Sequence, residues 1–316
     1  MRRPAIIASI LTLLAACDKT TPPADTLSVP LTAVSATSTI LFQVFGAREE
    51  PKAVPIAIVE GGKLAPITLD AAGWRLLDSL FFSAGGRLPI YRNGADVGTV
   101  EVVRGMWSPS EGQLYQLKSC RLLVPQALMR LQATTSTEES VEFLASSTKL
   151  LQRTDAQPLP RDAETQGRTL AGAVAAASEI GNEEVSHLDF IARWLRTGAG
   201  PGRRTLLASY IDPNAGDAGP GAGHTVMLLA LAEDSAGVLS MSYKHVATGE
   251  GRTVEFQRLA NHADLDGDGV DEIILEAWHY ASVPELTVLK YSAGKWTESF
   301  RVSENWCLDR DETKSP

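Results

Sequence analysis

The chain has 316 residues, of which 44% are hydrophobic and 6% aromatic, and it carries a formal net charge of −9 at neutral pH. This length and hydrophobic content suffice for one large hydrophobic core or two modest ones, and no apolar run beyond the N-terminus approaches the roughly 18 residues that a membrane-spanning helix needs. The acidic balance argues against nucleic acids and anionic lipid surfaces as partners, because phosphate groups repel an acidic protein.

Residues 1–17, MRRPAIIASILTLLAAC, have the pattern of an export signal, in which Arg2 and Arg3 precede an apolar stretch too short to cross a bilayer. The stretch ends in Leu-Ala-Ala-Cys, which resembles the lipobox of bacterial lipoproteins. In that family the cysteine is acylated and becomes the first residue of the mature protein. The resemblance implies that Cys17 carries lipid and anchors the protein on the periplasmic side of the cell envelope, in the inner or the outer membrane. The alternative is an ordinary cleaved signal in which the cysteine stands by chance.

Residues 18–38 are rich in Thr, Ser, Pro and Ala and lack apolar periodicity, which predicts a flexible tether. Two cysteines remain once Cys17 carries lipid. We expect these two, Cys120 and Cys307, to form a disulfide in an oxidising periplasm. The alternative is a pair of buried free thiols.

Residues 39–153 are predicted to form a β-rich N-terminal domain. Short apolar runs flank the Gly-Gly pair at 61–62 and the Asn-Gly pair at 93–94, which is the pattern of two β-hairpins. Between them, residues 69–82 place leucine and tryptophan near helical spacing. This spacing predicts one short helix packed on the sheet.

Residues 154–204 are predicted to hold a linker followed by helices. The segment 154–166 is polar and contains prolines, which is typical of a linker. One helix is expected around residues 170–177. A second is expected to begin at Asn182, as its N-cap, and to continue to a stop at Gly198.

Residues 205–307 are predicted to form a second domain, an antiparallel meander, followed by a tail at residues 308–316. Runs of aliphatic, β-branched and aromatic residues are separated there by clusters of Gly, Asp and Asn. The last runs form a hairpin over residues 292–294, where Tyr291 and Trp296 flank the turn. We interpret this aromatic pair as ordinary sheet packing, and a stacking platform for a sugar or base is the alternative.

The predicted fold class is therefore α+β and mainly β. It consists of two β-rich domains of antiparallel strands joined by a short helical segment.

Residues 264–272, DLDGDGVDE, place five acidic side chains in nine residues. Such crowding of like charge costs free energy unless a cation lies among the carboxylates. Counted from the first aspartate, carboxylates fall at positions 1, 3, 5 and 9, glycine at position 6 and a backbone carbonyl at position 7, a pattern that suits an oxygen cage around Ca²⁺. The expected ligands are Asp264, Asp266, Asp268, the Val270 carbonyl oxygen and Glu272. The alternative is a solvated acidic turn without metal.

The loop is not an EF-hand, because position 12 is Leu275 rather than glutamate and the residues that follow favour a strand. It resembles instead the DxDGDGxxD calcium loop of the integrin-type FG-GAP and VCBS repeats, which links two strands of a propeller blade. The last carboxylate of that motif is usually aspartate and here is Glu272. A complete propeller is not expected, since the chain has one such loop and residues 205–307 would hold only about two blades of roughly 40 to 50 residues.

Sequence signatures of common enzymes are missing, since the chain has no HExxH, CxxC, GxSxG or Walker-type motif. Their absence favours a non-enzymatic, envelope-anchored calcium-binding lipoprotein with a structural role or an envelope protein or glycan as its partner. The alternative is a periplasmic hydrolase whose site is built from dispersed Asp, Glu and His residues, including His262 next to the acidic loop.

The lipobox resemblance predicts that Cys17→Ser leaves the protein unlipidated and unprocessed at its signal. Incorporation of radiolabelled fatty acid in bacterial cells measures this, and Cys120→Ser serves as the control that keeps the label. Equal labelling of wild type and Cys17→Ser would contradict the prediction.

Overall fold

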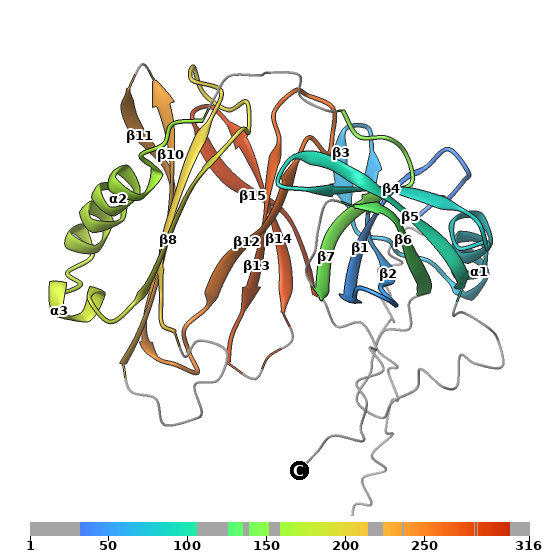
Figure 1. Ribbon diagram of the computed structural model, residues 1–316, viewed down its shortest axis with the longest axis horizontal. Coiled ribbons are helices and arrows are strands. Elements are labelled where there is room, and N and C mark those ends of the chain that lie inside the picture. Colours follow the sequence, from blue (N-terminus) through green and yellow to red (C-terminus); the bar gives the residue numbers. More distant parts are fainter. Residues whose placement is uncertain are drawn as a thin grey trace, which may run out of the picture. The chain divides into compact units, whose positions relative to one another are not determined.

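The computed structural model describes residues 32–105, 126–134, 139–151, 159–213, 224–235, 237–280, 282 and 284–303 (Figure 1). The predicted lipidation site Cys17 and the predicted disulfide between Cys120 and Cys307 lie outside the described residues, as do most of the tether and the whole tail. No helix within the described ranges is long and apolar enough to cross a membrane.

The prediction of a mainly β fold in the α+β class is confirmed. The described residues form 15 strands and three helices. Every strand pair among them is antiparallel, and the strands form one seven-stranded and two four-stranded sheets rather than a complete propeller. The expected domain boundaries remain predictions.

The N-terminal strands close into a barrel. They are β1 (Thr39–Ala47), β2 (Lys52–Glu60), β3 (Lys63–Ala65), β4 (Arg87–Arg92), β5 (Ala95–Gly105), β6 (Ala127–Thr134) and β7 (Ser140–Ser146). The sheet order is β1-β7-β4-β5-β6-β2-β3, and β1 also pairs with β2, so six strands form a ring with β3 attached outside it. Closure leaves the ring without unpaired edges, which are otherwise sites of aggregation.

Both predicted N-terminal hairpins are present. The β2–β3 hairpin turns at Gly61 and Gly62, and the β4–β5 hairpin turns at Asn93 and Gly94. Both residues of each turn have positive φ, with 51° at Asn93 and 73° at Gly94. Asn-Gly is favoured in such two-residue turns because asparagine and glycine tolerate this backbone region.

The predicted first helix is α1 (Ala71–Phe81), which begins after the N-cap Asp70. The Asp70 carboxylate accepts a hydrogen bond of 2.7 Å from the Gly73 N–H, which satisfies one of the free donors of the first turn. Leu77 of this helix is fully buried in the barrel core. The helix therefore packs on the sheet, as expected from its apolar spacing.

The first helix of the connecting segment is α2 (Ala163–Ala177), which is confirmed and begins earlier than expected. The second predicted helix is wrong beyond its first turn. α3 (Asn182–Val185) is four residues long, its N-cap is Gly181 instead of Asn182, and the strand β8 (Asp189–Leu195) follows it.

The segment Asp189–Leu195 is a strand because tertiary pairing overrides its helical spacing. Its sequence, DFIARWL, holds aromatic and β-branched residues that favour strands. It pairs with the next strand along its whole length, from Asp189 opposite Ile211 to Leu195 opposite Thr205. Of the apolar residues at helical spacing, Val185 lies in α3, whereas Ile191 and Leu195 lie in β8 on one face of the sheet.

The predicted C-terminal antiparallel strands are confirmed, but they form two successive meanders instead of one. The first has the order β11-β10-β9-β8 and contains, besides β8, the strands β9 (Thr205–Ile211), β10 (His224–Ser235) and β11 (Val238–Glu250). The second has the order β12-β13-β14-β15 and consists of β12 (Phe256–Ala263), β13 (Glu272–Trp278), β14 (Glu285–Ser292) and β15 (Lys295–Ser303).

The central strands of these two sheets are buried on both faces. Neighbouring residues of β10 alternate between two cores, since Leu228 packs with α2 and Leu229 packs with the second sheet. Along β13, Ile273 packs with the first sheet while Ile274 packs with the barrel core. The layers therefore follow one another as α2, first sheet, second sheet and barrel. Burial on both faces explains why β10 and β13 read as continuous apolar runs instead of alternating ones.

The hairpin at the C-terminal end of the second sheet turns at Ala293 and Gly294. Tyr291 and Trp296 lie opposite each other across it, with ring centroids 5.2 Å apart. Trp296 is buried, and its indole N–H donates a 2.7 Å hydrogen bond to Glu233 of the first sheet. The pair therefore packs between the two four-stranded sheets, and the buried Trp296 offers no open face for a ligand.

Asp78 in α1 is a destabilising charge near neutral pH. Its Oδ1 atom is buried and has no hydrogen-bond partner among the described residues. Burial raises the pKa of Asp78 from 3.8 to about 6. Above that pH the folded state must hold a partly desolvated carboxylate.

Asp78→Asn is expected to raise the melting temperature at pH 7.5, because the amide removes this charge. In the wild type, the stability gained by protonation is present in full below the unfolded pKa of 3.8 and is lost as pH rises through about 6. The advantage of the variant should therefore shrink as pH falls from about 7 to about 4. Thermal unfolding across this range measures it, with the exposed Asp189→Asn as control. A gain in melting temperature that does not change with pH would contradict the raised pKa of Asp78.

Candidate metal centre

The acidic loop connects β12 and β13 of the second sheet. Ala263 and Glu272 face each other as the last pair of the ladder, and the residues between them form the loop. Gly267 and Gly269 have φ of 82° and 86°, a backbone region that side chains disfavour. The two glycines thus permit the tight path that brings the loop's carboxylates together.

Backbone N–H groups orient four carboxylates of the loop. Asp264 accepts hydrogen bonds from Gly267 at 2.7 Å and from Gly269 at 3.0 Å. The remaining bonds run from Asp268 N–H to Asp266 at 3.2 Å, from Val270 N–H to Asp268 at 2.8 Å and from Leu265 N–H to Glu272 at 2.8 Å. These bonds fix the direction of each carboxylate within the loop itself.

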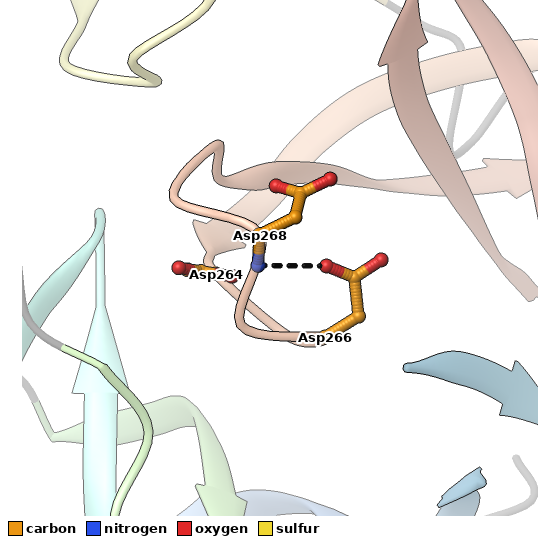
Figure 2. A group of neighbouring side chains, drawn as sticks. All are labelled: Asp264, Asp266 and Asp268. Atoms are coloured by element: carbon orange, nitrogen blue, oxygen red, sulfur yellow. Dashed lines mark hydrogen bonds between the residues drawn. The ribbon is translucent and has the colours of Figure 1, made fainter. Parts of the chain in front are cut away.

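Three of the predicted ligands converge. Asp264, Asp266 and Asp268 each offer an oxygen, and these oxygens lie within 4.8 Å of one another. Figure 2 shows the three side chains and the hydrogen bond from the Asp268 N–H to Asp266. Oxygen ligands lie about 2.3 to 2.6 Å from Ca²⁺, so oxygens on opposite sides of one ion are separated by about 5 Å. The three aspartate oxygens are therefore close enough to share one cation of this size.

The other two predicted ligands are Glu272, which is not a member of the converging group, and the Val270 carbonyl oxygen. Glu272 is the first residue of β13, is 3% exposed and is tied to the loop by the Leu265 N–H. Val270 lies in the loop, where its N–H donates to Asp268. The Val270 carbonyl oxygen remains a predicted ligand.

The fifth carboxylate of the loop belongs to a different contact. Asp271 Oδ2 lies 2.8 Å from His262 Nδ1, and the two side chains are 2% and 3% exposed. The Asp271 N–H donates to the Thr197 carbonyl at 2.7 Å. This carboxylate is thus engaged in a buried polar pair and does not belong to the group formed by Asp264, Asp266 and Asp268.

Lys290 is a member of the site that sequence reasoning missed. Its ammonium group, on β14, contacts the carboxylate of Asp266, lies 2.7 Å from Asp268 and lies 3.7 Å from Glu272. The signal that could have found it is the β13–β14 register. Ile273 pairs with Leu289, so the same ladder extended by one step sets Lys290 beside Glu272.

The electrostatics of the loop reflect its crowding. Burial raises the pKa of Glu272 to about 8, and the nearby charge of Asp266 adds to this rise. The pKa of Asp264 is also raised, chiefly by burial. Burial alone would lower the pKa of Lys290, but its hydrogen bonds to Asp266 and Asp268 outweigh this effect and raise it. A divalent cation among these oxygens would favour the charged carboxylates.

The base of the loop is fixed to the barrel. Asn93 in the β4–β5 turn donates its N–H to Asn261 Oδ1 at 2.8 Å, and Asn261 Nδ2 donates to the Tyr91 carbonyl at 2.8 Å. Asp264 forms a β-bridge with Leu151, which follows the barrel strands. The loop therefore lies where the barrel and the second sheet meet.

The histidines required by the hydrolase alternative do not converge with several carboxylates in the described residues. His262 is buried against Asp271, His224 pairs with Glu184, and His245 contacts the Glu255 carbonyl. Asp264, Asp266 and Asp268 are the one group of three or more potential ligands found there. The small cavity between the barrel and the second sheet contains no histidine among its lining residues. No geometric support for a hydrolytic site follows from these residues.

Comparison of the chain with protein-family models, curated proteins and solved structures gives no match.

Gly94 is confined by the buried pair next to the loop. A Cβ atom added at Gly94 would lie 2.4 Å from His262 Cε1 and 2.9 Å from Asp271 Oδ2. The backbone at Gly94 also has positive φ, which alanine tolerates poorly. Gly85 has a φ of 83° but no neighbour within 4 Å of the added atom, so it isolates the backbone effect.

Gly94→Ala is therefore expected to lower the free energy of unfolding by roughly 2 to 4 kcal/mol, since backbone strain and overpacking add. Gly85→Ala should lose only about 1 to 2 kcal/mol from the backbone effect alone. Urea unfolding of both variants gives the comparison. Equal losses would show that the β4–β5 turn does not press on the His262–Asp271 pair.

Proposed function

We propose that the protein is an envelope-anchored, calcium-binding lipoprotein with a structural or partner-binding role. The observation that carries the proposal is the convergence of the Asp264, Asp266 and Asp268 oxygens within 4.8 Å. The backbone hydrogen bonds of the loop support it, because they hold these carboxylates facing one another before any ion binds.

The donor set favours calcium among the common metal ions. All the proposed ligands are oxygen atoms, which hard cations prefer, and the zinc ligands His and Cys are missing from the set. Mg²⁺ demands near-ideal octahedral geometry and keeps most of its water, whereas Ca²⁺ accepts six to eight oxygens in flexible arrangements. A loop that supplies four carboxylates and a carbonyl therefore suits Ca²⁺ better.

The position of the loop supports a structural role for the ion. Asp264 bridges to Leu151, and the neighbouring Asn261 is hydrogen-bonded to the β4–β5 turn of the barrel. An ion that orders the loop would thus stabilise the β12–β13 connection and its contact with the barrel. For the partner-binding role, we propose an envelope protein or a glycan as the partner. The net charge of −9 disfavours nucleic acid.

The proposed location is the periplasmic side of the cell envelope, where lipid on Cys17 would anchor the protein. The lipobox resemblance supports this part of the proposal. Calcium is plentiful outside the cytoplasm, so a site with a dissociation constant of about 10⁻⁴ to 10⁻³ M would be substantially filled there.

Chelation of calcium is expected to lower the melting temperature of the mature protein by a few degrees instead of unfolding it. At a calcium concentration ten times the dissociation constant, an ion that binds only the folded state contributes about 1.4 kcal/mol. For a protein of this size, about 1 kcal/mol corresponds to roughly 2 to 4 °C. Asp266→Ala combined with Asp268→Ala should abolish the shift, because too few carboxylates remain to offset dehydration of the ion.

The matched control is Glu49→Ala combined with Glu50→Ala, which removes the same charge from exposed positions outside the loop. Calorimetric titration and melting curves with and without chelator provide the readout. No bound calcium at millimolar concentration, together with a melting curve that chelator leaves unchanged, would refute the calcium site.

A further inference from the structure

The oxygens of the acidic loop are divided between two kinds of partner. In Asp266, Oδ1 accepts the Asp268 N–H while Oδ2 faces Lys290. In Asp268, Oδ1 accepts the Val270 N–H while Oδ2 lies 2.7 Å from the Lys290 ammonium. In Glu272, Oε2 accepts the Leu265 N–H while Oε1 lies 3.7 Å from the same ammonium. The backbone thus takes one oxygen each of Asp266, Asp268 and Glu272, and Lys290 faces the other. In Asp264, both oxygens accept backbone N–H groups.

The oxygens that face Lys290 are the ones that a bound calcium ion would need. Besides Asp264, a calcium ion that preserved the loop would draw on Asp266 Oδ2, Asp268 Oδ2 and Glu272 Oε1, because the second oxygen of each of these three carboxylates holds a backbone N–H. An ammonium at hydrogen-bonding distance and a calcium ion at about 2.3 to 2.6 Å cannot share these oxygens without close approach of like charges. Calcium and the Lys290 ammonium are therefore alternative cations for one cluster.

Lys290 is placed to leave when an ion arrives. Its side chain is 35% exposed, whereas those of Asp266 and Glu272 are 7% and 4% exposed. It lies near the end of β14, three residues before Ala293, the first residue of the two-residue turn. Lysine is a strongly hydrated charge on a flexible four-carbon stem, so its head can move into water while the stem stays on the sheet.

We propose that Lys290 is a built-in competitor of calcium, which neutralises the acidic loop in the absence of the ion and sets a weak affinity by having to be displaced. This inference rests on the proposed calcium site. It accounts for how a folded protein can hold the crowded carboxylates of the loop at low calcium. It also assigns the affinity of the site to a residue outside the loop sequence.

Lys290→Met tests the proposal, because methionine keeps an unbranched apolar stem and removes the charge. Removal of one positive charge a few ångströms from a doubly charged ion is expected to lower the calcium dissociation constant at least about tenfold. In chelator, the same variant should melt below wild type, and calcium should close most of that gap. Lys290→Arg should retain the weak affinity because it retains the charge.

Lys295→Met is the matched control, since Lys295 is an exposed lysine on the neighbouring strand β15. Titration calorimetry on the wild type and the three variants gives the dissociation constants. An unchanged dissociation constant in Lys290→Met, with calcium still bound by wild type, overturns the competitor role and leaves the calcium site standing. Binding by Lys290→Met alone supports the competitor role and contradicts calcium binding by the natural protein. Absence of binding in every variant overturns both.

A second measurement uses the wild-type protein and does not depend on the folding of any variant. Lys290 released into water should react faster with an acetylating reagent, so its labelling measured by mass spectrometry should rise several-fold when calcium replaces chelator. Lys295 provides the internal control and should not change. Equal labelling of Lys290 in both conditions would overturn the proposal.

Discussion

The central constraint on this structure is that β13, a central strand of the second four-stranded sheet, is covered on both faces. Ile273 and Leu275 of β13 face the first sheet, and Ile274 between them faces the barrel core. Burial of apolar surface stabilises by roughly 25 cal/mol for each Å². These contacts on two faces therefore make β13 an apolar link between the barrel and the first four-stranded sheet. The buried polar residues Asn261 and His262 lie near the end of β12, and the β12–β13 connection holds the acidic loop.

The parts of the fold that the sequence predicts are those that depend on residues close to one another in the chain. The hairpins at Gly61 and Asn93 follow from turn chemistry within a few residues, and α1 follows from a cap and a local apolar stripe. Such features depend on near neighbours and need no knowledge of tertiary contacts. The segment Asp189–Leu195 is different, because its apolar spacing suits a helix and its pairing with β9 makes it a strand. The closure of the barrel between β1 and β2 and the division of the C-terminal strands into two sheets also depend on long-range pairing.

The same distinction holds for the candidate site. Asp264, Asp266 and Asp268 can be assigned from their spacing, because one short loop supplies them all and the structure brings them together. Lys290 cannot be assigned in this way, since it comes from another strand and reaches the cluster only through the β13–β14 register. The pairing of Asp271 with His262 is likewise a tertiary contact. A linear motif thus identifies the carboxylates of the loop but not the groups that balance their charge.

The closed barrel has a consequence for the order in which an exported chain folds. All its strands lie between residues 39 and 146, so its ring of backbone hydrogen bonds can form before the C-terminal strands are available. Its apolar surface is not complete at that stage, because Ile56 and Phe143 line the boundary that Ile274 and Leu286 later cover. Chains fold from the N-terminus as they emerge, and exposed apolar surface on an intermediate favours aggregation. A chain that had emerged only as far as residue 146 would therefore expose this apolar surface, and docking of β13 and β14 would cover it.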